Sequence, residues 1–158
     1  MADEAQDQAP AAQAGQGGGW VDPYRGFNFK LEVQGLTEGH FAECTGLGMK
    51  VHVISFREGG TNLTHRIPGP VEYNGITLRY GLTKSTELWD WLQKVVQGNL
   101  ERRNVSIVML EPDGQLEALR WNLIDAWPSE WQGARLDASA KELAIESMTL
   151  VFEGLERG

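Results

Sequence analysis

Short stretches of alternating apolar and polar residues, separated by turn signals, limit this chain to a mainly β fold. In the clearest stretch, residues 27–34, every second residue is apolar, which predicts a half-buried strand. Glycine and proline turn signals recur about every 8–12 residues, a spacing typical of β-sandwiches and β-barrels. The sequence therefore predicts about eight or nine short strands in a β-sandwich or β-barrel.

A hairpin with a glycine tip is predicted over residues 51–67. In residues 49–57 both faces are partly apolar, a pattern typical of a strand covered on both sides or of one lining a closed barrel. Residues 58–60 (Glu-Gly-Gly) permit the positive φ angles of a tight turn. We expect residues 68–70 (Pro-Gly-Pro) to end the hairpin, because proline provides no N–H to the ladder.

One helix is expected, with Thr83 or Ser85 as its N-cap and Gly98 as the residue that ends it. Its charged side, with Asp90 and Lys94, should point outward. Apolar residues at helical spacing should form a buried stripe against a sheet. They are Leu88, Trp91, Leu92 and Val95, widened by Trp89 and Val96.

Further strands are expected on both sides of the helix. An Asn-Gly turn at residues 74–75 leads into one strand, and residues 105–110, apolar on both faces, form a central strand. After a returning strand, a corner at residues 126–128 (Ala-Trp-Pro) should lead into a separate short strand. In residues 142–153 the alternation changes phase, which predicts a bulge near Glu146 or burial of both faces.

Residues 1–19 are rich in Ala, Gln and Gly and carry three acidic side chains. We interpret them as a disordered arm that precedes a single domain over residues 20–158. They contain neither the basic nor the apolar region of a signal peptide, and no run of 18 apolar residues occurs in the chain. We therefore expect a soluble protein that is synthesised in the cytoplasm.

Charge and cysteine content exclude two classes of protein. The chain has 14 Lys and Arg against 22 Asp and Glu, a net charge of -8. This balance opposes binding to phosphates, so we expect no direct nucleic-acid specificity. Cys44 is the only cysteine, which excludes a secreted disulfide scaffold, and we expect it to be a small buried side chain.

The sequence contains no arrangement of residues that predicts catalysis, and we expect no enzyme, no cofactor and no metal site. His40, His52 and His65 lack the close paired spacing of common zinc sites. Other residues are interpreted as solvated, core or interface groups. They are the carboxylates of Glu43, Glu58 and Glu72, and the indoles of Trp127 and Trp131.

Together, several short stretches resemble the tail-tube proteins of contractile phages and of the related phage-tail-like contractile injection systems. The resemblance covers roughly residues 20–155. The matching stretches, in chain order, are Asp22-Pro23-Tyr24-Arg25, Phe27-Asn28-Phe29, Phe41-Ala42-Glu43-Cys44-Thr45-Gly46-Leu47, Phe56-Arg57-Glu58-Gly59-Gly60, Gly81-Leu82-Thr83, Leu88-Trp89-Asp90-Trp91, Trp121-Asn122, Ala126-Trp127-Pro128 and Ile145-Glu146.

The resemblance implies a sandwich or barrel of two packed antiparallel sheets with one flanking α-helix. Six copies would form a hexameric ring whose strands close one large shared β-barrel around a channel. Rings would stack into an inner tube within a contractile sheath, as part of an assembled phage-tail-like particle. The implied partners are further copies of the chain, the sheath protein, the baseplate or tube-initiator protein, the tail terminator and a cargo effector in the channel.

The same resemblance assigns roles to residues of the hairpin and the helix. Contacts between subunits and between rings are expected from Arg57, Glu58, Gly59, Gly60 and Asn62. The channel is expected to be lined by Val53, Ser55 and Arg57, with Ile54 and Phe56 in the core. The sheath is expected to face Glu87, Asp90 and Lys94.

Two alternatives remain open on the sequence alone. A baseplate tube-initiator paralogue would share the fold but form a single ring. A monomeric ligand-binding β-barrel would also combine alternating strands with one helix, and it would enclose an apolar cavity. Rings or tubes on one side, and a strict monomer on the other, separate these classes.

Overall fold

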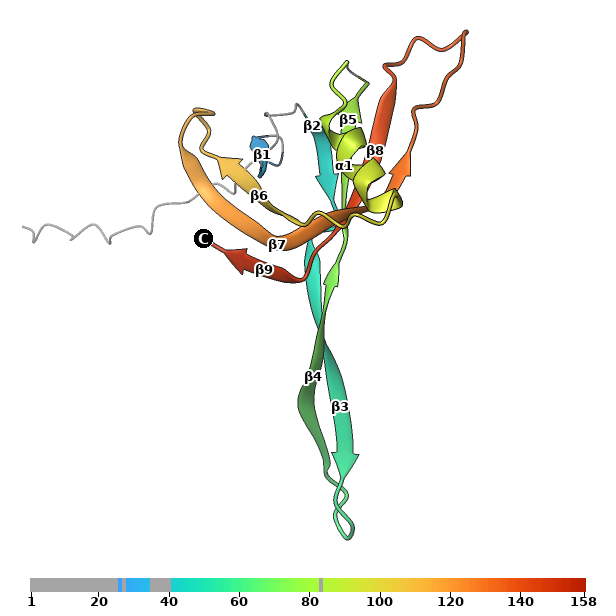
Figure 1. Cartoon of the computed structure of the whole chain (residues 1–158). Coiled ribbons are helices and arrows are strands. Elements are labelled where there is room, and N and C mark those ends of the chain that lie inside the picture. Colours follow the sequence, from blue (N-terminus) through green and yellow to red (C-terminus); the bar gives the residue numbers. More distant parts are fainter. Residues whose placement is uncertain (1–25, 27, 35–40, 83) are drawn as a thin grey trace, which may run out of the picture.

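The computed structural model describes residues 26, 28–34, 41–82 and 84–158 (Figure 1). Expectations for residues 1–25, for Phe27, for His40 and for Thr83 lie outside the described residues. The elements in chain order are β1 (Phe29–Val33), β2 (Phe41–Thr45), β3 (Gly48–Arg57), β4 (Thr64–Asn74), β5 (Ile76–Gly81), α1 (Glu87–Val96), β6 (Arg103–Leu110), β7 (Glu117–Gln132), β8 (Ile145–Val151) and β9 (Gly154–Arg157).

Two antiparallel layers are joined by the long strand β7. Strands pair in the order β1-β6-β7-β8-β5-β2, and β9 also pairs with β7. The first part of β7 pairs with β6 and β9, and its last part pairs with β8. A φ of 54° at Asp125 and register shifts near Arg103 and Pro128 accompany this change of partner. The predicted mainly β fold with two antiparallel sheets and one helix is confirmed.

The core takes side chains from both layers and from the helix. Leu31 and Val33 of β1 are buried, as the alternation in residues 27–34 predicts. Val108 of β6 is buried together with its neighbour Ile107, which confirms that this strand is apolar on both faces. Together with β1, the core cluster comprises Ile76, Leu78, Trp91, Val105, Ile107, Leu123, Ala126, Met148, Leu150 and Phe152.

The helix α1 packs on β7 and is anchored by Trp91, which is fully buried. The indole Nε1 of Trp91 donates a 2.7 Å hydrogen bond to the backbone oxygen of Glu101. The guanidinium of Arg103 lies 5.2 Å from the centroid of the same indole, a cation–π distance. The helix is followed by Gly98, whose φ of +88° confirms its expected role.

Two expectations for the helix are wrong. Its N-cap is Thr86 rather than Ser85, and the Thr86 hydroxyl donates to the carboxylate of Asp90 instead of capping a backbone N–H. Trp89 and Val96 do not widen the buried stripe, because they are 42% and 68% exposed. A ten-residue helix that packs through Trp91 on one strand covers only the width of one stripe.

One expectation for the C-terminal half is also wrong, and of the two alternatives for another only one agrees with the structure. The Ala-Trp-Pro corner does not end a strand, since β7 continues through it to Gln132 and β8 supplies new pairing partners. The bulge near Glu146 does not form, because β8 pairs with β5 in an unbroken register and Leu143 lies before the strand with 86% exposure. The other alternative, burial of both faces, agrees with the structure, since every residue of β8 is at least half-buried. The short strand β9 was not predicted.

The hairpin of β3 and β4 stands apart from the layers (Figure 1). Residues 68–70 do not end it, since β4 runs through them to Asn74. Two β4 residues, Gly69 and Pro70, lie opposite the single residue His52, which forms a bulge. Each strand of a two-stranded ribbon has one free edge, and there a proline without an N–H is tolerated. The Asn-Gly turn at residues 74–75 is wrong too, because β5 pairs with β2 and not with β4.

Candidate assembly surface

The hairpin forms an arm, which we define as residues 48–74, comprising β3, β4 and the turn between them. Figure 1 shows it projecting from one end of the layered body. Every residue from Met49 to Pro68 is exposed. In the described part of the chain, β3 and β4 pair only with each other. The arm is therefore an extended ribbon without a core of its own.

One face of the arm, which we call the aromatic face, is apolar near the tip. Phe56 lies opposite His65, and their rings stack with centroids 5.1 Å apart. Ile54 lies opposite Ile67, and cross-strand partners share a face of the ribbon. Ile54 and Phe56 are 47% and 44% exposed, so the expectation that they lie in the chain's own core is wrong.

Nearer the body the aromatic face becomes polar. The ring Nε2 of His52 lies 2.8 Å from Oε2 of Glu72, and Glu72 also pairs in register with Lys50. A β-carbon on Gly69 would lie 2.9 Å from the backbone oxygen of His52. The bulge therefore needs glycine at this position.

The opposite face, which we call the basic face, is polar near the tip and apolar near the body. The expected channel residues Val53, Ser55 and Arg57 lie on it together, since they alternate along β3. Arg66, opposite Ser55, adds a second positive charge close to Arg57. Near the body this face is apolar, with exposed Met49, Val51, Val53 and Val71.

The tip holds the residues that were expected to make ring contacts. Gly60 has a φ of +91°, which favours glycine, and the backbone N–H of Thr61 donates to the oxygen of Glu58 over 3.4 Å. No atom lies within 4 Å of a β-carbon placed on Gly59 or Gly60. Asn62 is exposed as well. The structure thus gathers all of these residues at one open end of the arm.

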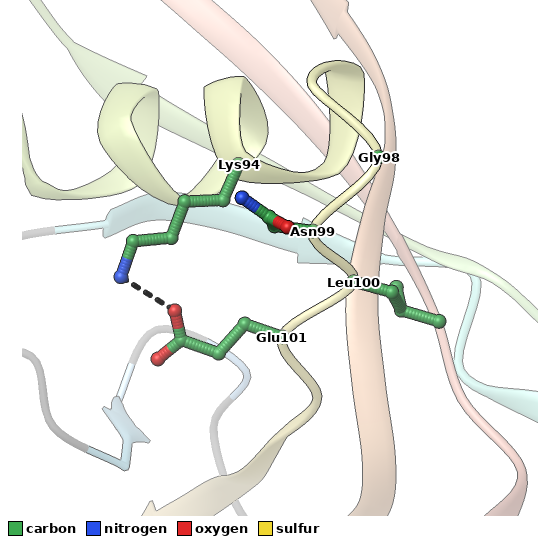
Figure 2. Close-up of a pocket in the computed structure, with 5 residues that line it drawn as sticks. All are labelled: Lys94, Gly98, Asn99, Leu100 and Glu101. Carbon is green, nitrogen blue, oxygen red and sulfur yellow. Dashed lines mark hydrogen bonds and ion pairs between the residues drawn. The ribbon is translucent and has the colours of Figure 1, made fainter.

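The expected sheath residues lie elsewhere, on α1. Asp90 and Lys94 are exposed and Glu87 is half-buried. Figure 2 shows Lys94 beside a hollow of about 550 Å³ at the end of the helix, with its Nζ 2.6 Å from Oε2 of Glu101. Hydrogen bonds from Lys94 and then Arg103 hold the pKa of Glu101 below its usual value. The hollow is also lined by Gly98, Asn99 and Leu100.

The other expected polar and nucleophilic residues do not form one common site in the described structure. They include no group of three His, Cys, Asp or Glu side chains able to hold a metal ion. Glu43 pairs with Arg79 at 3.1 Å, while Glu58 and Glu72 belong to the arm. Cys44 packs against the core, and burial raises the pKa of its thiol to about 11. A thiol with this pKa is protonated at neutral pH and is a poor nucleophile.

Sequence reasoning found the tip but missed part of the surface. Val71 of β4 is 49% exposed, and it lies beyond residues 51–67, the range over which the hairpin was expected. The Pro-Gly-Pro sequence at residues 68–70 interrupts the alternation of β4, so the sequence pattern did not indicate that the strand continues to Asn74. No helix in the described ranges has both the length and the apolar character needed to cross a membrane.

A family model described as T4-like virus tail tube protein gp19 matches residues 25–156. None of the curated proteins matches this chain.

Solved structures with a similar fold include two chains of an extracellular contractile injection system. A chain from the sheath–tube complex of an extracellular contractile injection system, PVC, in its extended state is 25% identical, with a TM-score of 0.79, covering 86% of this chain and 91% of that one. A chain from the PVC sheath/tube terminator is 25% identical, with a TM-score of 0.80, covering 87% and 98%. Hcp1 from Flavobacterium johnsoniae shares the fold at 16% identity, with a TM-score of 0.53, covering 82% and 94%.

Proposed function

Because the chain belongs to the T4-like virus tail tube protein gp19 family, we propose that this structural, tube-type protein is the repeating subunit of an inner tube. Six copies form a ring, and the rings stack around a channel inside a sheath. The family match over residues 25–156 supports one tube domain that runs from about residue 20 to residue 158, preceded by a separate segment over residues 1–19.

The observation that carries this proposal is that both faces of the arm are open and partly apolar. Residues from Met49 to Pro68 are exposed, and they include Phe56 on one face and Val53 on the other. An isolated two-stranded ribbon is marginally stable in water, and its free edges invite further pairing. Neighbouring copies that pair with the free edges and cover the face of Phe56 remove part of this exposed apolar surface, at about 1 kcal/mol or more for each side chain buried.

Closure of a ring also satisfies the free edges. When a strand edge continues into an identical neighbour around a closed ring, no edge is left over. Tail tube relatives and this chain share the layered body, so we propose that the arms of six copies extend the layers into one shared barrel. A subunit with this role needs no catalytic residues, and we propose that it is not an enzyme.

Roles for individual residues follow from the two faces of the arm. We propose that Val53 and Ser55 line the channel, and that Arg57, at the end of the same face, lies where the channel wall meets the next ring. The tip residues Glu58, Gly59, Gly60 and Asn62 make contacts between rings. The exposed side of α1, with Glu87, Asp90 and Lys94, faces the sheath. The location of three channel candidates on one face of β3 supports this arrangement.

The similar chains come from a sheath–tube complex and a sheath/tube terminator. We propose by analogy that this protein contacts a sheath, a baseplate or initiator protein and a terminator, and that it carries cargo in its channel. The particle would be a phage-tail-like assembly.

Negative-stain electron microscopy of the purified protein tests the proposal. Hollow tubes of stacked rings are the expected result. Single rings that never stack would instead support a terminator or initiator role, a second candidate because the chain is about equally similar to the terminator chain and to the sheath–tube chain. A protein that stays monomeric at high concentration would contradict both roles.

A further inference from the structure

A half-buried carboxylate lies at the end of the body opposite the arm. Glu146 stands near the start of β8, in register with Tyr80 near the end of β5. β5 begins at Ile76, directly after the arm, so Tyr80 and Glu146 lie at the far ends of their strands. Figure 1 shows the arm leaving one end of the body and β5, β8 and α1 extending toward the other.

Two aromatic side chains, Tyr80 and Trp131, contact this carboxylate and Trp89 packs on Trp131; we call Glu146, Tyr80, Trp131 and Trp89 the Glu146 site. The indole Nε1 of Trp131 donates to Oε2 of Glu146 over a long 3.5 Å. The rings of Trp89 and Trp131 meet edge to face with centroids 4.9 Å apart, and Trp89 is 42% exposed. Burial raises the pKa of Tyr80 to about 12, and the charge of Glu146 and a hydrogen bond from the Tyr80 hydroxyl to Glu146 add to the shift.

The carboxylate of Glu146 lacks a cationic partner. No Lys, Arg or His in the described ranges forms an ion pair with it, although it is half-buried. A carboxylate offers about four acceptor positions, and Tyr80 and Trp131 fill at most two of them. A guanidinium fits such a place, because it binds a carboxylate through two N–H groups and stacks on indole rings.

The arm carries guanidinium groups without partners. Arg57 and Arg66 lie close together on the basic face, both are exposed, and neither forms an ion pair with any described residue. Residues 48–74 contain three Lys or Arg and two Asp or Glu, a formal charge of +1 in a chain of net charge -8. The arm is therefore a positive segment of an acidic molecule, and an acidic copy of the same chain attracts it.

The guanidinium groups of the arm and the carboxylate of Glu146 lie at opposite ends of one molecule. They cannot form an ion pair within a monomer, but between copies they form a head-to-tail contact that repeats along an axis. We propose that the Glu146 site receives Arg57 or its neighbour Arg66 from the arm of a copy in the adjacent ring. This inference rests on the proposed stacking of rings, and it names the acceptor of the arm.

Charge exchange tests the pairing. Glu146→Gln keeps the shape of the side chain and should raise the protein concentration needed for tube formation about ten- to a hundredfold. Glu146→Arg and the double variant Arg57→Glu with Arg66→Glu should each stop stacking, and the combination of all three changes in one chain should restore tubes. Normal tubes from Glu146→Arg, with tubes also from the unchanged protein, would overturn the inference and leave the proposed function intact.

Cross-linking provides a second measurement that does not depend on the folding of charge variants. In a Cys44→Ser background, subunits with Arg66→Cys are mixed with subunits with Glu146→Cys, and assembled tubes are treated with a short bis-maleimide, because a disulfide spans less than an Arg–Glu pair. Cross-linked dimers from tubes are expected, with Glu111→Cys in place of Glu146→Cys as the unreactive control. Intact tubes that give dimers no faster than this control would contradict the pairing. The absence of any tubes would instead contradict the proposed function.

Discussion

The backbone at Gly46 passes so close to Gly75 that a β-carbon on Gly46 would lie 2.6 Å from the Gly75 carbonyl oxygen. Gly46 also has a φ of +90°. The two glycines lie where β2 leads into β3 and β4 leads into β5, so both strands of the arm leave the body at this contact. The direction of the arm depends on two residues without side chains.

Replacing Gly46 with Ala should destabilise the protein more than replacing a glycine with the same φ in open space. Gly98 is that control, since its φ is +88° and no atom lies within 4 Å of its β-carbon position. We expect Gly98→Ala to lower the free energy of unfolding by about 1–2 kcal/mol. Gly46→Ala should cost about 1–3 kcal/mol more, because backbone must shift. Urea denaturation of the monomer measures both values, and equal losses would show that the close contact is unimportant.

A polar substitution on the aromatic face of the arm should prevent assembly without unfolding the chain. Phe56→Ser and Val53→Ser change exposed side chains on opposite faces, so each should alter the free energy of unfolding of the monomer by less than about 0.5 kcal/mol. Sedimentation velocity should show monomers for Phe56→Ser, whereas Val53→Ser, proposed to face the channel, should still form rings or tubes. Leu116→Ser, at an exposed position outside the arm, is a second control and should assemble normally. Assembly by Phe56→Ser would refute the role of the aromatic face.

A bulky residue at the tip should interfere with stacking alone. Gly59 has space around its β-carbon position and no positive φ, so Gly59→Val should leave the monomer as stable as before. Gly60→Val should cost stability as well, because φ is +91° there. Electron microscopy of Gly59→Val should show rings without tubes. Tubes of normal length would remove the tip from the contacts between rings.

Stability should depend on pH through Arg120. Its guanidinium bonds Glu117 and Glu32. A hydrogen bond from Arg120 lowers the pKa of Glu117 below 4.5, and hydrogen bonds from Lys30 and then Arg120 lower that of Glu32. Carboxylates with lowered pKa values stabilise the folded state above about pH 4.5, and this contribution is lost as the pH falls through their folded-state pKa values.

The stability difference between the unchanged protein and Arg120→Gln should therefore be largest near neutral pH and shrink below about pH 4.5. Denaturation at several pH values measures this difference. Arg66→Gln, which removes an arginine without an ion pair among the described residues, should show no such trend. A difference for Arg120→Gln that stays constant down to acid pH would contradict the assignment.

Local patterns predicted the elements well because their causes are local. Alternation in residues 27–34 identified the buried Leu31 and Val33, since side chains of a strand alternate between faces. The positive φ at Gly98 followed from the end of an apolar stripe. In both cases the signal and the structure involve residues within two helical turns of each other.

Expectations failed where pairing partners decide the outcome. The proline at position 68 was expected to end a strand, but proline is tolerated on a ribbon with free edges. Ile54 and Phe56 look like core residues in sequence, yet they are exposed because β3 has no partner other than β4 in the described structure. The Glu146 site was not predicted, since Tyr80 and Glu146 meet only through the register of β5 with β8.

Hydrogen–deuterium exchange over residues 48–74 tests the central claim most directly, that the arm is open in the monomer and covered in the tube. Backbone amides on the free edges of β3 and β4 should exchange rapidly in the monomeric Phe56→Ser variant. In assembled tubes of the unchanged protein they should exchange at least about tenfold more slowly, because neighbouring copies pair with these edges. Equal exchange of the arm in monomers and tubes would contradict the account.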